Sequence, residues 1–233
     1  LRSLGVPEDR IRKVTPGRDL QPAAEGGEGG EVRARLGLGD ALVLLTVARL
    51  AERYKGHDAV IRALPLIRAK VPRVRYVIAG DGPLRPFYAR LAQSLGVEDA
   101  VVFTGTITGQ DVAALYAAAD VFIMASRESR IAGGAEGFGI VFLEASRMGK
   151  PVVGGRSGGI PDAVADGVTG LLVNPVDTRE IADTVIGLLT DPGRARSLGE
   201  NGRRMVLARF RPEQIAQEFR AVLAEVALIR RKG

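Results

Sequence analysis

The chain has 233 residues, of which 46% are apolar, and this is enough for one sizeable core or for one domain with appendages. It has no cysteine, which excludes a disulfide framework and a thiolate metal site, and no run of about 18 apolar residues that would span a membrane. The net charge is +6, and residues 194–233 account for all of it with ten Lys or Arg and four Glu.

The first 40 residues form a lead-in, residues 1–20, and a stretch rich in Gly, Glu and Ala that predicts a surface loop and a short helix. After residue 40, apolar runs typical of buried strands alternate with helical patterns. We expect strands at 41–47, 74–80, 100–105, 120–126, 150–155 and 169–175. We expect helices at 57–70, 83–95 and 109–119, from about Phe138 onward, and at 177–190, 193–208 and 212–230.

This alternation predicts an α/β fold with a doubly wound parallel sheet of about six strands, covered by helices on both faces. We expect a lead-in and surface loop over 1–39, a Rossmann-like domain over 40–211 and a basic C-terminal helix over 212–233. The start at Leu1, without a methionine, suggests a fragment of a longer protein, and no signal peptide is visible. In such a sheet, ligands bind at the carboxyl ends of the strands, where the strand order reverses.

The loop after the first strand contains two cations, Arg49 and Lys55, with Gly56 beside them. A planar guanidinium and a point-like ammonium suit a phosphate, although an ordinary basic surface loop would look the same. The loop lacks the G-x-G-x-x-G pattern of dinucleotide-binding domains, and "GDGPLR" at 80–85 follows the second strand and ends in Arg85. An NAD site is therefore disfavoured, and no P-loop pattern is present.

His57 is the only histidine, so neither a Ser-His-Asp triad nor a His-rich metal site can be built within the chain. The stretch "EGFGIVFLE" instead carries a carboxylate at each end, Glu136 and Glu144. If a helix starts near Phe138, Glu144 lies about 9 Å along it, at about 1.5 Å per residue. That spacing favours bracketing an elongated ligand over paired-carboxylate hydrolysis of one bond.

A nucleotide sugar has a matching order of parts: a ribose diol, a diphosphate and sugar hydroxyls. Backbone N–H groups at Gly137, Phe138 and Gly139 would attract the phosphates at a helix start, and the two carboxylates would accept hydrogen bonds from hydroxyls. The alternative is an ordinary helix with one Glu before it and one half-exposed Glu on it. The residues alone leave these two interpretations open.

The motifs also resemble a known family, family 4 retaining glycosyltransferases of the GT-B fold, over nearly the whole chain. The segments that carry the resemblance are "EGFGIVFLEA", "ARLAERYKG", "GVPEDRIRKVTPGRD", "VIAGDGP", "VVFTGTI", "LYAAADVFIMAS", "GKPVVGGRSGGIPDAVADGVTGLLVNPVD" and "LLTDPGRARSLGENGRR". The resemblance implies that this chain is the C-terminal, donor-binding domain. It also implies an N-terminal acceptor-binding domain that is missing from the chain.

The resemblance assigns site residues by position. Arg49 and Lys55 would hold the diphosphate, Glu136 would contact the transferred sugar, and Glu144 would bind the ribose hydroxyls. Arg49, Lys55 and Glu136 are thus the candidate catalytic residues. Backbone amides on the donor would come from Gly137, Phe138, Gly139, Ile140 and Val141, and Thr106 and Ile107 would flank the base. The loop "SRESRIAGGAEGFG" and the "SGG" at 157–159 would line the donor pocket, and Arg49 and Lys55 are six residues apart where many relatives have five.

The closest resemblance is to bacterial mannosyltransferases that act on phosphatidylinositol mannosides with GDP-mannose; a UDP-glucose-type donor is the main alternative. Fixed cations and helix amides can stabilise a departing diphosphate, so we expect no metal and no cofactor besides the donor. A stand-alone nucleotide-binding module is the alternative of another class.

We expect a cytoplasmic protein without transfer activity in isolation. For the basic C-terminal segment, a solvated helix face is favoured, and an anionic membrane surface is the alternative. With only four Tyr and seven Phe, the chain offers little for stacking on nucleic acid.

Overall fold

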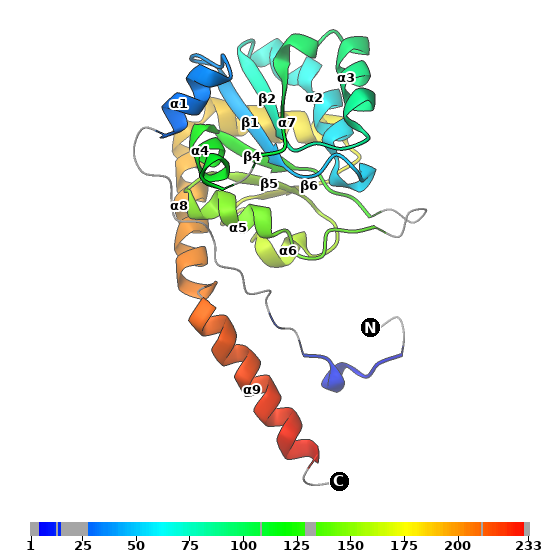
Figure 1. Cartoon of the computed structure of the whole chain (residues 1–233), viewed down its shortest axis with the longest axis vertical. Coiled ribbons are helices and arrows are strands. Elements are labelled where there is room, and N and C mark those ends of the chain that lie inside the picture. The colour runs from blue at the N-terminus through cyan, green and yellow to red at the C-terminus, as the bar shows by residue number, and fades with distance from the viewer. Residues whose placement is uncertain are drawn as a thin grey trace. The chain divides into compact units, whose positions relative to one another are not determined.

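A computed structural model of the chain describes residues 5–12, 14, 28–107, 109–128, 134–210 and 212–230. The chain forms two compact units, residues 20–204 and residues 1–19 together with 205–233. The larger unit is built around one sheet flanked by helices (Figure 1). The N-terminal stretch 21–27, on which part of the expected surface loop falls, lies outside the described residues.

The sheet has six strands in the order β3-β2-β1-β4-β5-β6, and every neighbouring pair is parallel. The doubly wound parallel sheet expected from the sequence is therefore confirmed. Each strand is one to four residues shorter than its expected range, at its start, at its end or at both. The strands are β1 (Leu42–Val47), β2 (Val74–Ala79), β3 (Val101–Gly105), β4 (Val121–Met124), β5 (Val152–Gly155) and β6 (Leu171–Val173).

Helices cover both faces of the sheet, as right-handed crossovers in two opposite directions from β1 require. On one face α2 packs against α3 and α7, and on the other α4 contacts β1 and α5 contacts β5 (Figure 1). The helices are α1 (Glu28–Arg35), α2 (His57–Lys70), α3 (Arg85–Ser94), α4 (Gln110–Ala118), α5 (Ile140–Arg147), α6 (Ile160–Ala163), α7 (Thr178–Thr190) and α8 (Pro192–Arg209). Short 3-10 turns lie at Glu8–Arg10, Arg53–Lys55 and Glu98–Ala100.

The core lies on both faces of the central strands. All four residues of β4 and of β5 are buried, as expected of strands between two helical layers. A buried hydroxyl pair inside this core is satisfied, because Thr46 Oγ1 lies 2.8 Å from the Tyr76 hydroxyl oxygen and also donates to the Ile123 carbonyl. The Tyr88 hydroxyl, by contrast, is buried without a hydrogen-bond partner among the described residues.

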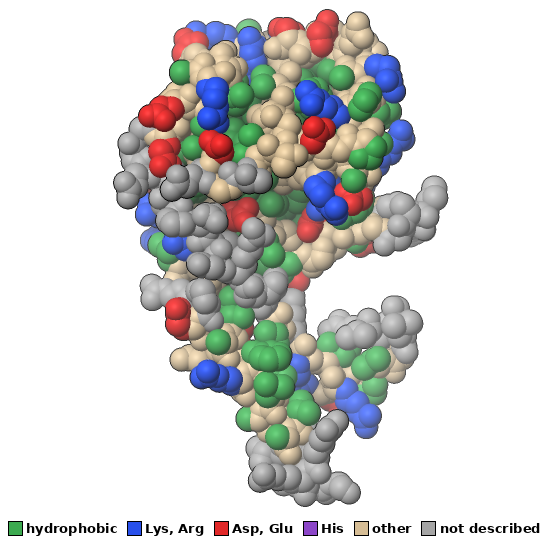
Figure 2. Space-filling view, in the orientation of Figure 1, with side chains coloured by type: hydrophobic (Ala, Val, Ile, Leu, Met, Phe, Trp, Pro, Cys, Tyr) green, Lys and Arg blue, Asp and Glu red, His purple; other side chains and the backbone are tan. Residues whose placement is uncertain are grey.

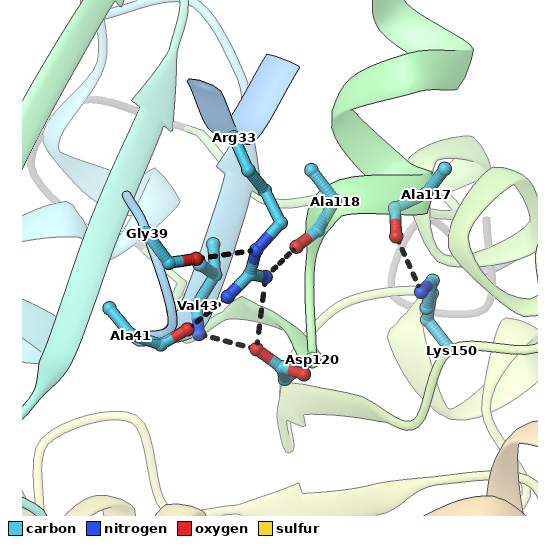
Figure 3. A network of polar contacts seen from close by, with 8 residues as sticks. All are labelled: Arg33, Gly39, Ala41, Val43, Ala117, Ala118, Asp120 and Lys150. Carbon is cyan, nitrogen blue, oxygen red and sulfur yellow. Dashed lines mark hydrogen bonds and ion pairs between the residues drawn. The ribbon is translucent and has the colours of Figure 1, made fainter. Parts of the chain in front are cut away.

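The edge of the sheet where the strands begin holds a polar network centred on Arg33 of α1 (Figure 3). The Asp120 carboxylate, just before β4, accepts the Val43 N–H at 2.7 Å and lies 3.6 Å from the Arg33 guanidinium. Arg33 also donates to three backbone carbonyls, those of Gly39, Ala41 and Ala118. The network ties α1, the start of β1 and the end of α4 together.

Lys150 extends this edge on the other side of α4 (Figure 3). Its ammonium donates to the Ala117 carbonyl at 2.8 Å, so a lysine and an arginine both contact the C-terminal end of α4. Cations at that end complement the helix dipole. Burial lowers the pKa of Lys150, an effect that the nearby Asp120 carboxylate opposes.

The smaller unit contains α9 (Pro212–Arg230), to which Arg12 is joined by a two-pronged ion pair with Glu225. Hydrophobic side chains gather along α9 in Figure 2, and the large exposed ones, at i, i+4 and i+7, are Phe219, Leu223 and Val226. Because α9 has two Arg and three Glu, the positive excess lies on α8, which has five Arg and one Glu. None of the helices in the described ranges is both long and apolar enough to cross a bilayer.

Candidate functional site

The strand order reverses between β1 and β4, since the chain builds β2 and β3 on one side of β1 and then returns to add β4, β5 and β6 on the other. In sheets of this kind, ligands bind outside the carboxyl ends of the strands at the point where the strand order reverses, here after β1 and β4. Arg49 and Lys55 follow β1, and Glu136 follows β4. The predicted site residues thus belong to this edge.

Lys55 and Glu136 form an ion pair that joins these two loops. The Lys55 ammonium lies 2.6 Å from Glu136 Oε2, and the side chains are only 18% and 14% exposed. Charges shielded from water to this degree require a partner, and each supplies the other's. The sequence analysis predicted that both residues serve one ligand, but it did not predict that they contact each other.

Arg49 is the more accessible of the two cations. Its side chain is 81% exposed, and its only ion pair within the described residues is with Glu52 at 3.1 Å. Lys55 is directed to Glu136, whereas Arg49 lies at the surface of the same loop. The two cations predicted to act together are therefore held very differently: one is in a shielded ion pair and the other is exposed.

The backbone around Arg49 is fixed by the loop after β2. Leu50 donates its N–H to the Asp81 carbonyl at 2.9 Å, and its own carbonyl accepts the Leu84 N–H at 2.8 Å. A side chain at Gly80 would put its Cβ 2.1 Å from the Ala48 carbonyl oxygen, which no residue but glycine avoids. The glycines of "GDGP" thus allow two loops to approach closely.

Helix α5, which follows the loop that contains Glu136, starts two residues later than expected, at Ile140 rather than near Phe138. Gly139, with φ of 86°, lies in the left-handed region and so cannot continue the helix backward. Glu144 is therefore four residues beyond the helix start, about 6 Å along it rather than about 9 Å. The first-turn N–H groups, which have no partner within a helix, belong to Ile140 and Val141.

The loop after β5 holds the backbone of Glu136 and Gly137 in place. The Gly159 N–H donates to the Glu136 carbonyl at 2.8 Å. A Cβ at Gly158 would lie 2.4 Å from the Glu136 carbonyl oxygen, and one at Gly159 would lie 2.0 Å from that of Gly137. The "SGG" expected near the donor therefore acts here as a close-packed support for the segment that leads into α5.

Glu144 lies on α5, half-buried, and accepts a hydrogen bond from the Tyr116 hydroxyl of α4 at 2.8 Å. This hydrogen bond partly satisfies a carboxylate that lies among the apolar residues of α5. Tyr116 was not among the predicted site residues, and its only signal is a hydroxyl on an otherwise Ala-rich helix. Thr106, exposed, and Ile107, half-buried, follow β3 as expected.

A second ion pair involves Asp58, which was not predicted as a site residue, and Arg127, which was predicted only as part of the loop expected to line the donor pocket. Arg127, in the loop after β4, makes a bidentate ion pair with Asp58 of α2, at 3.0 and 2.9 Å. Both lie in segments that follow strands, which is the signal that could have selected them. The middle of the expected donor loop, residues 129–133, lies outside the described residues.

Several buried polar atoms at this edge have no hydrogen-bond partner within the described part of the chain. They are Glu52 Oε2, both ring nitrogens of His57, Ser126 Oγ and Ser157 Oγ, and each residue follows β1, β4 or β5. Burial lowers the pKa of His57 to about 4, a shift that Asp58 opposes and Lys55 reinforces. His57 is therefore neutral at pH 7. Its ring packs against that of Tyr88, with 5.1 Å between the two ring centroids.

Among the described residues, no group of three or more His, Cys, Asp or Glu is arranged to hold a metal ion. The charged groups that the site does offer are cations and single carboxylates on loops after parallel strands.

Residues 30–205 match the family described as glycosyl transferases group 1. The chain belongs to this family. It is 43% identical over 202 residues to the GDP-mannose-dependent alpha-(1-6)-phosphatidylinositol monomannoside mannosyltransferase of Mycolicibacterium smegmatis, a match that covers 86% of this chain and 53% of the relative. The chain thus spans about half the length of the curated relatives it matches.

Solved structures agree with the fold. HepE from Anabaena in complex with UDP superposes with a TM-score of 0.84 at 26% identity, over 96% of this chain and 60% of that one. The C-terminal domain of LpcC, a group 1 glycosyl transferase of Francisella tularensis, has a TM-score of 0.69 at 24% identity and is 96% covered, a likeness of fold. The Rossmann-like half of a GT-B glycosyltransferase, expected from the resemblance, is confirmed.

Proposed function

We propose that this chain is the nucleotide-sugar-binding domain of a retaining hexosyltransferase that transfers mannose from GDP-mannose to a lipid or saccharide acceptor. The observation that carries the proposal is the shielded Lys55–Glu136 pair at the reversal of strand order. Similarity to a relative that uses GDP-mannose supports the choice of sugar and base.

In this proposal, the ion pair opens when the donor binds. The diphosphate takes Lys55 as its cation, and the Glu136 carboxylate then accepts hydrogen bonds from hydroxyls of the sugar. The pair keeps both charged groups in place beforehand, so the diphosphate takes the place of the Glu136 carboxylate as the partner of the Lys55 ammonium. Arg49, exposed and paired only with Glu52 among the described residues, is available to the same diphosphate.

The remaining contacts follow the order of parts in the donor. Backbone amides of Gly137, Phe138, Gly139, Ile140 and Val141 would approach the phosphates and the sugar at the start of α5. Glu144 would bind the ribose diol, and Thr106 and Ile107 would flank the base. The difficult step is departure of the nucleoside diphosphate from the anomeric carbon, and fixed cations with helix amides stabilise the charge that develops on it.

Direct binding tests this assignment. Calorimetry with the chain should detect GDP, and Lys55→Ala and Glu144→Ala should each weaken its binding markedly. If both variants bind GDP as the parent chain does, the site is elsewhere.

A UDP-linked donor, such as UDP-glucose, is the second candidate, because HepE is seen in complex with UDP and with UDP-glucose. Titration of GDP and UDP into the same chain separates the two. We expect tighter binding of GDP, and the reverse order would replace mannose with a UDP-linked sugar.

The proposal assigns acceptor binding to an N-terminal domain outside these 233 residues, as the family resemblance implies. The chain should then bind the nucleotide yet transfer no sugar alone, and rapid transfer by the chain alone would contradict this. A stand-alone nucleotide-binding module would likewise bind without transfer. The two alternatives differ when an N-terminal domain of the family is added: a donor-binding domain should then transfer sugar, and a stand-alone module should not.

We also propose peripheral binding at the inner face of the cytoplasmic membrane for a lipid acceptor. Its support is the exposed arginines of α8, namely Arg194, Arg196, Arg203, Arg204 and Arg209. Binding to vesicles that contain anionic lipid should fall when these are changed to Gln and should persist without residues 212–233, which carry little net charge. Binding that is unaffected by the arginine changes would remove this idea.

A further inference from the structure

The loop after β4 is joined to the segment that carries Lys55 at three points. The Arg127 N–H donates to the Tyr54 carbonyl at 2.8 Å. Gly56 lies so close to the loop that a Cβ there would be 2.0 Å from the Ala125 carbonyl oxygen. The Arg127 side chain then reaches Asp58. Lys55 is thus held by contacts at residues 54, 56 and 58.

The ion pair between Arg127 and Asp58 is the only one of these three contacts that depends on side-chain chemistry alone. Each terminal guanidinium nitrogen of Arg127 donates to one Asp58 carboxylate oxygen, at 3.0 and 2.9 Å, and the side chains are 24% and 17% exposed. A planar fork on a planar carboxylate fixes orientation as well as distance, which a lysine cannot do. Limited exposure makes the pair less subject to screening than a surface pair.

The Arg127–Asp58 pair is placed so that it can affect the positions of the site residues. Asp58 lies in the first turn of α2, three residues beyond Lys55, while Arg127 lies at the start of the loop that leads to Glu136. The pair therefore connects the two segments whose tips meet in the Lys55–Glu136 contact. If the Arg127–Asp58 pair is lost, Lys55 and Glu136 keep their charges, but one of the contacts that fix their positions is gone.

We propose that Arg127 is a positioning residue that, through Asp58, places the Lys55 ammonium for the terminal phosphate of a nucleoside diphosphate. This role rests on the proposed function. Because the constraint acts on Lys55, its loss should weaken binding of the diphosphate far more than binding of the corresponding monophosphate.

The decisive variant is Asp58→Asn. It removes a negative charge close to an anion site, so simple electrostatics predicts tighter phosphate binding. It also removes one half of the bidentate contact, so positioning predicts weaker binding. Arg127→Met and Arg127→Lys complete the set, because Arg127→Met removes the charge and Arg127→Lys keeps the charge but removes the planar, bidentate contact. Arg68→Met is the matched control, because Arg68 makes a similar bidentate pair with Asp99 away from this edge, at 2.7 and 2.9 Å.

Calorimetry with GDP and GMP, and with UDP and UMP in parallel, measures the ratio of diphosphate to monophosphate affinity for each folded variant. We expect Asp58→Asn, Arg127→Met and Arg127→Lys each to lower that ratio about tenfold, and the double variant Asp58→Asn with Arg127→Met to lower it no further. Arg68→Met should leave it unchanged.

An unchanged or raised ratio in Asp58→Asn would overturn the positioning role, as would an equal loss of GDP and GMP binding in Arg127→Met. In either case the parent chain would still bind the diphosphate, and the proposed function would stand. If the parent chain binds neither GDP nor UDP, the proposed function fails and this role fails with it.

Discussion

The two edges of the same sheet treat polar groups in opposite ways. Where the strands begin, Arg33 pairs with Asp120, and both of these residues and Lys150 form hydrogen bonds with the backbone around β1 and α4 (Figure 3). Where the strands end, Lys55 and Glu136 are paired, but Arg49 is exposed and buried atoms of His57 and Ser126 have no partner among the described residues. Both edges are built from the same strands and crossovers.

The difference indicates what each edge is for. A saturated network stabilises the fold and leaves nothing for a ligand to replace. Unpaired buried atoms and an ion pair between loops lower the stability of the free chain, and folds tolerate such features at functional sites. Substitutions where the strands begin, at the amino-end edge, should therefore change only the free energy of unfolding. Substitutions where the strands end, at the carboxyl-end edge, should change ligand affinity or reveal groups, such as His57, whose burial lowers the free energy of unfolding.

The largest effect should come from His57 at acid pH. Its pKa is about 4 in the folded chain against 6.5 for an unburied histidine, so the unfolded state binds the proton first as the pH falls. The free energy of unfolding should be unaffected by His57 above about pH 6.5 and should decrease by about 3 kcal/mol down to pH 4. Denaturant unfolding at several pH values measures this decrease.

The matched variant for that measurement is His57→Phe, which keeps a ring against Tyr88 and cannot titrate. Because His57 is the only histidine, the slope between pH 5 and 6.5 should nearly vanish in the variant. An identical slope in both chains would show that the imidazole is hydrated or paired, and the contrast between the edges would weaken.

Two lysines give the next test, one at each edge. Lys55→Ala should weaken GDP binding by about 2 kcal/mol, or roughly thirtyfold, because it removes the shielded cation proposed for the diphosphate. Lys150→Ala removes a lysine of comparable burial that caps α4, and it should leave GDP affinity unchanged. Calorimetry on both chains decides, and an equal loss of affinity would mean that the lysines act through overall charge.

The fold followed from the sequence because its signals are periodic and redundant. The apolar runs and helical patterns that predicted six strands and α2 come from burial on both faces, which constrains many residues at once. The start of α5 was placed two residues too early, because a helical apolar pattern does not reveal that Gly139 adopts a left-handed conformation. The α6 turn, four residues long, gave too short a pattern to be predicted.

The residues by themselves indicate candidate site positions where a charged side chain follows a strand, as Arg49 and Lys55 do, and the donor-binding role of these residues stays a prediction. Pairings between distant segments left no trace in the sequence. Lys55 and Glu136 are 81 residues apart, and Arg127 and Asp58 are 69 apart, so the contact depends on the tertiary path of both loops. Tyr116 reaches Glu144 only because α4 and α5 lie on the same face of the sheet.

Arg33 tests the amino-end edge by itself. Arg33→Met would leave three carbonyls and the Asp120 carboxylate without their cation, at a partly buried position with 24% exposure. We expect the free energy of unfolding to fall by about 1.5 kcal/mol, the usual cost of unsatisfied polar groups at such sites. GDP affinity should not change, and a variant that lost affinity would show that the two edges are coupled through β1.

The smallest effect on stability should come from the other arginine, Arg49. Among the described residues it pairs only with Glu52, three residues on, and its own side chain is 81% exposed, so the pair should contribute less than about 1 kcal/mol. Arg49→Met should therefore unfold at nearly the same denaturant concentration as the parent chain while binding GDP about tenfold more weakly, as expected for loss of a charge-assisted contact. Arg33→Met should show the reverse, a lower unfolding midpoint and unchanged affinity. If Arg49→Met lowers the unfolding midpoint as much as Arg33→Met does, Arg49 is a structural residue and the diphosphate is held by Lys55 alone.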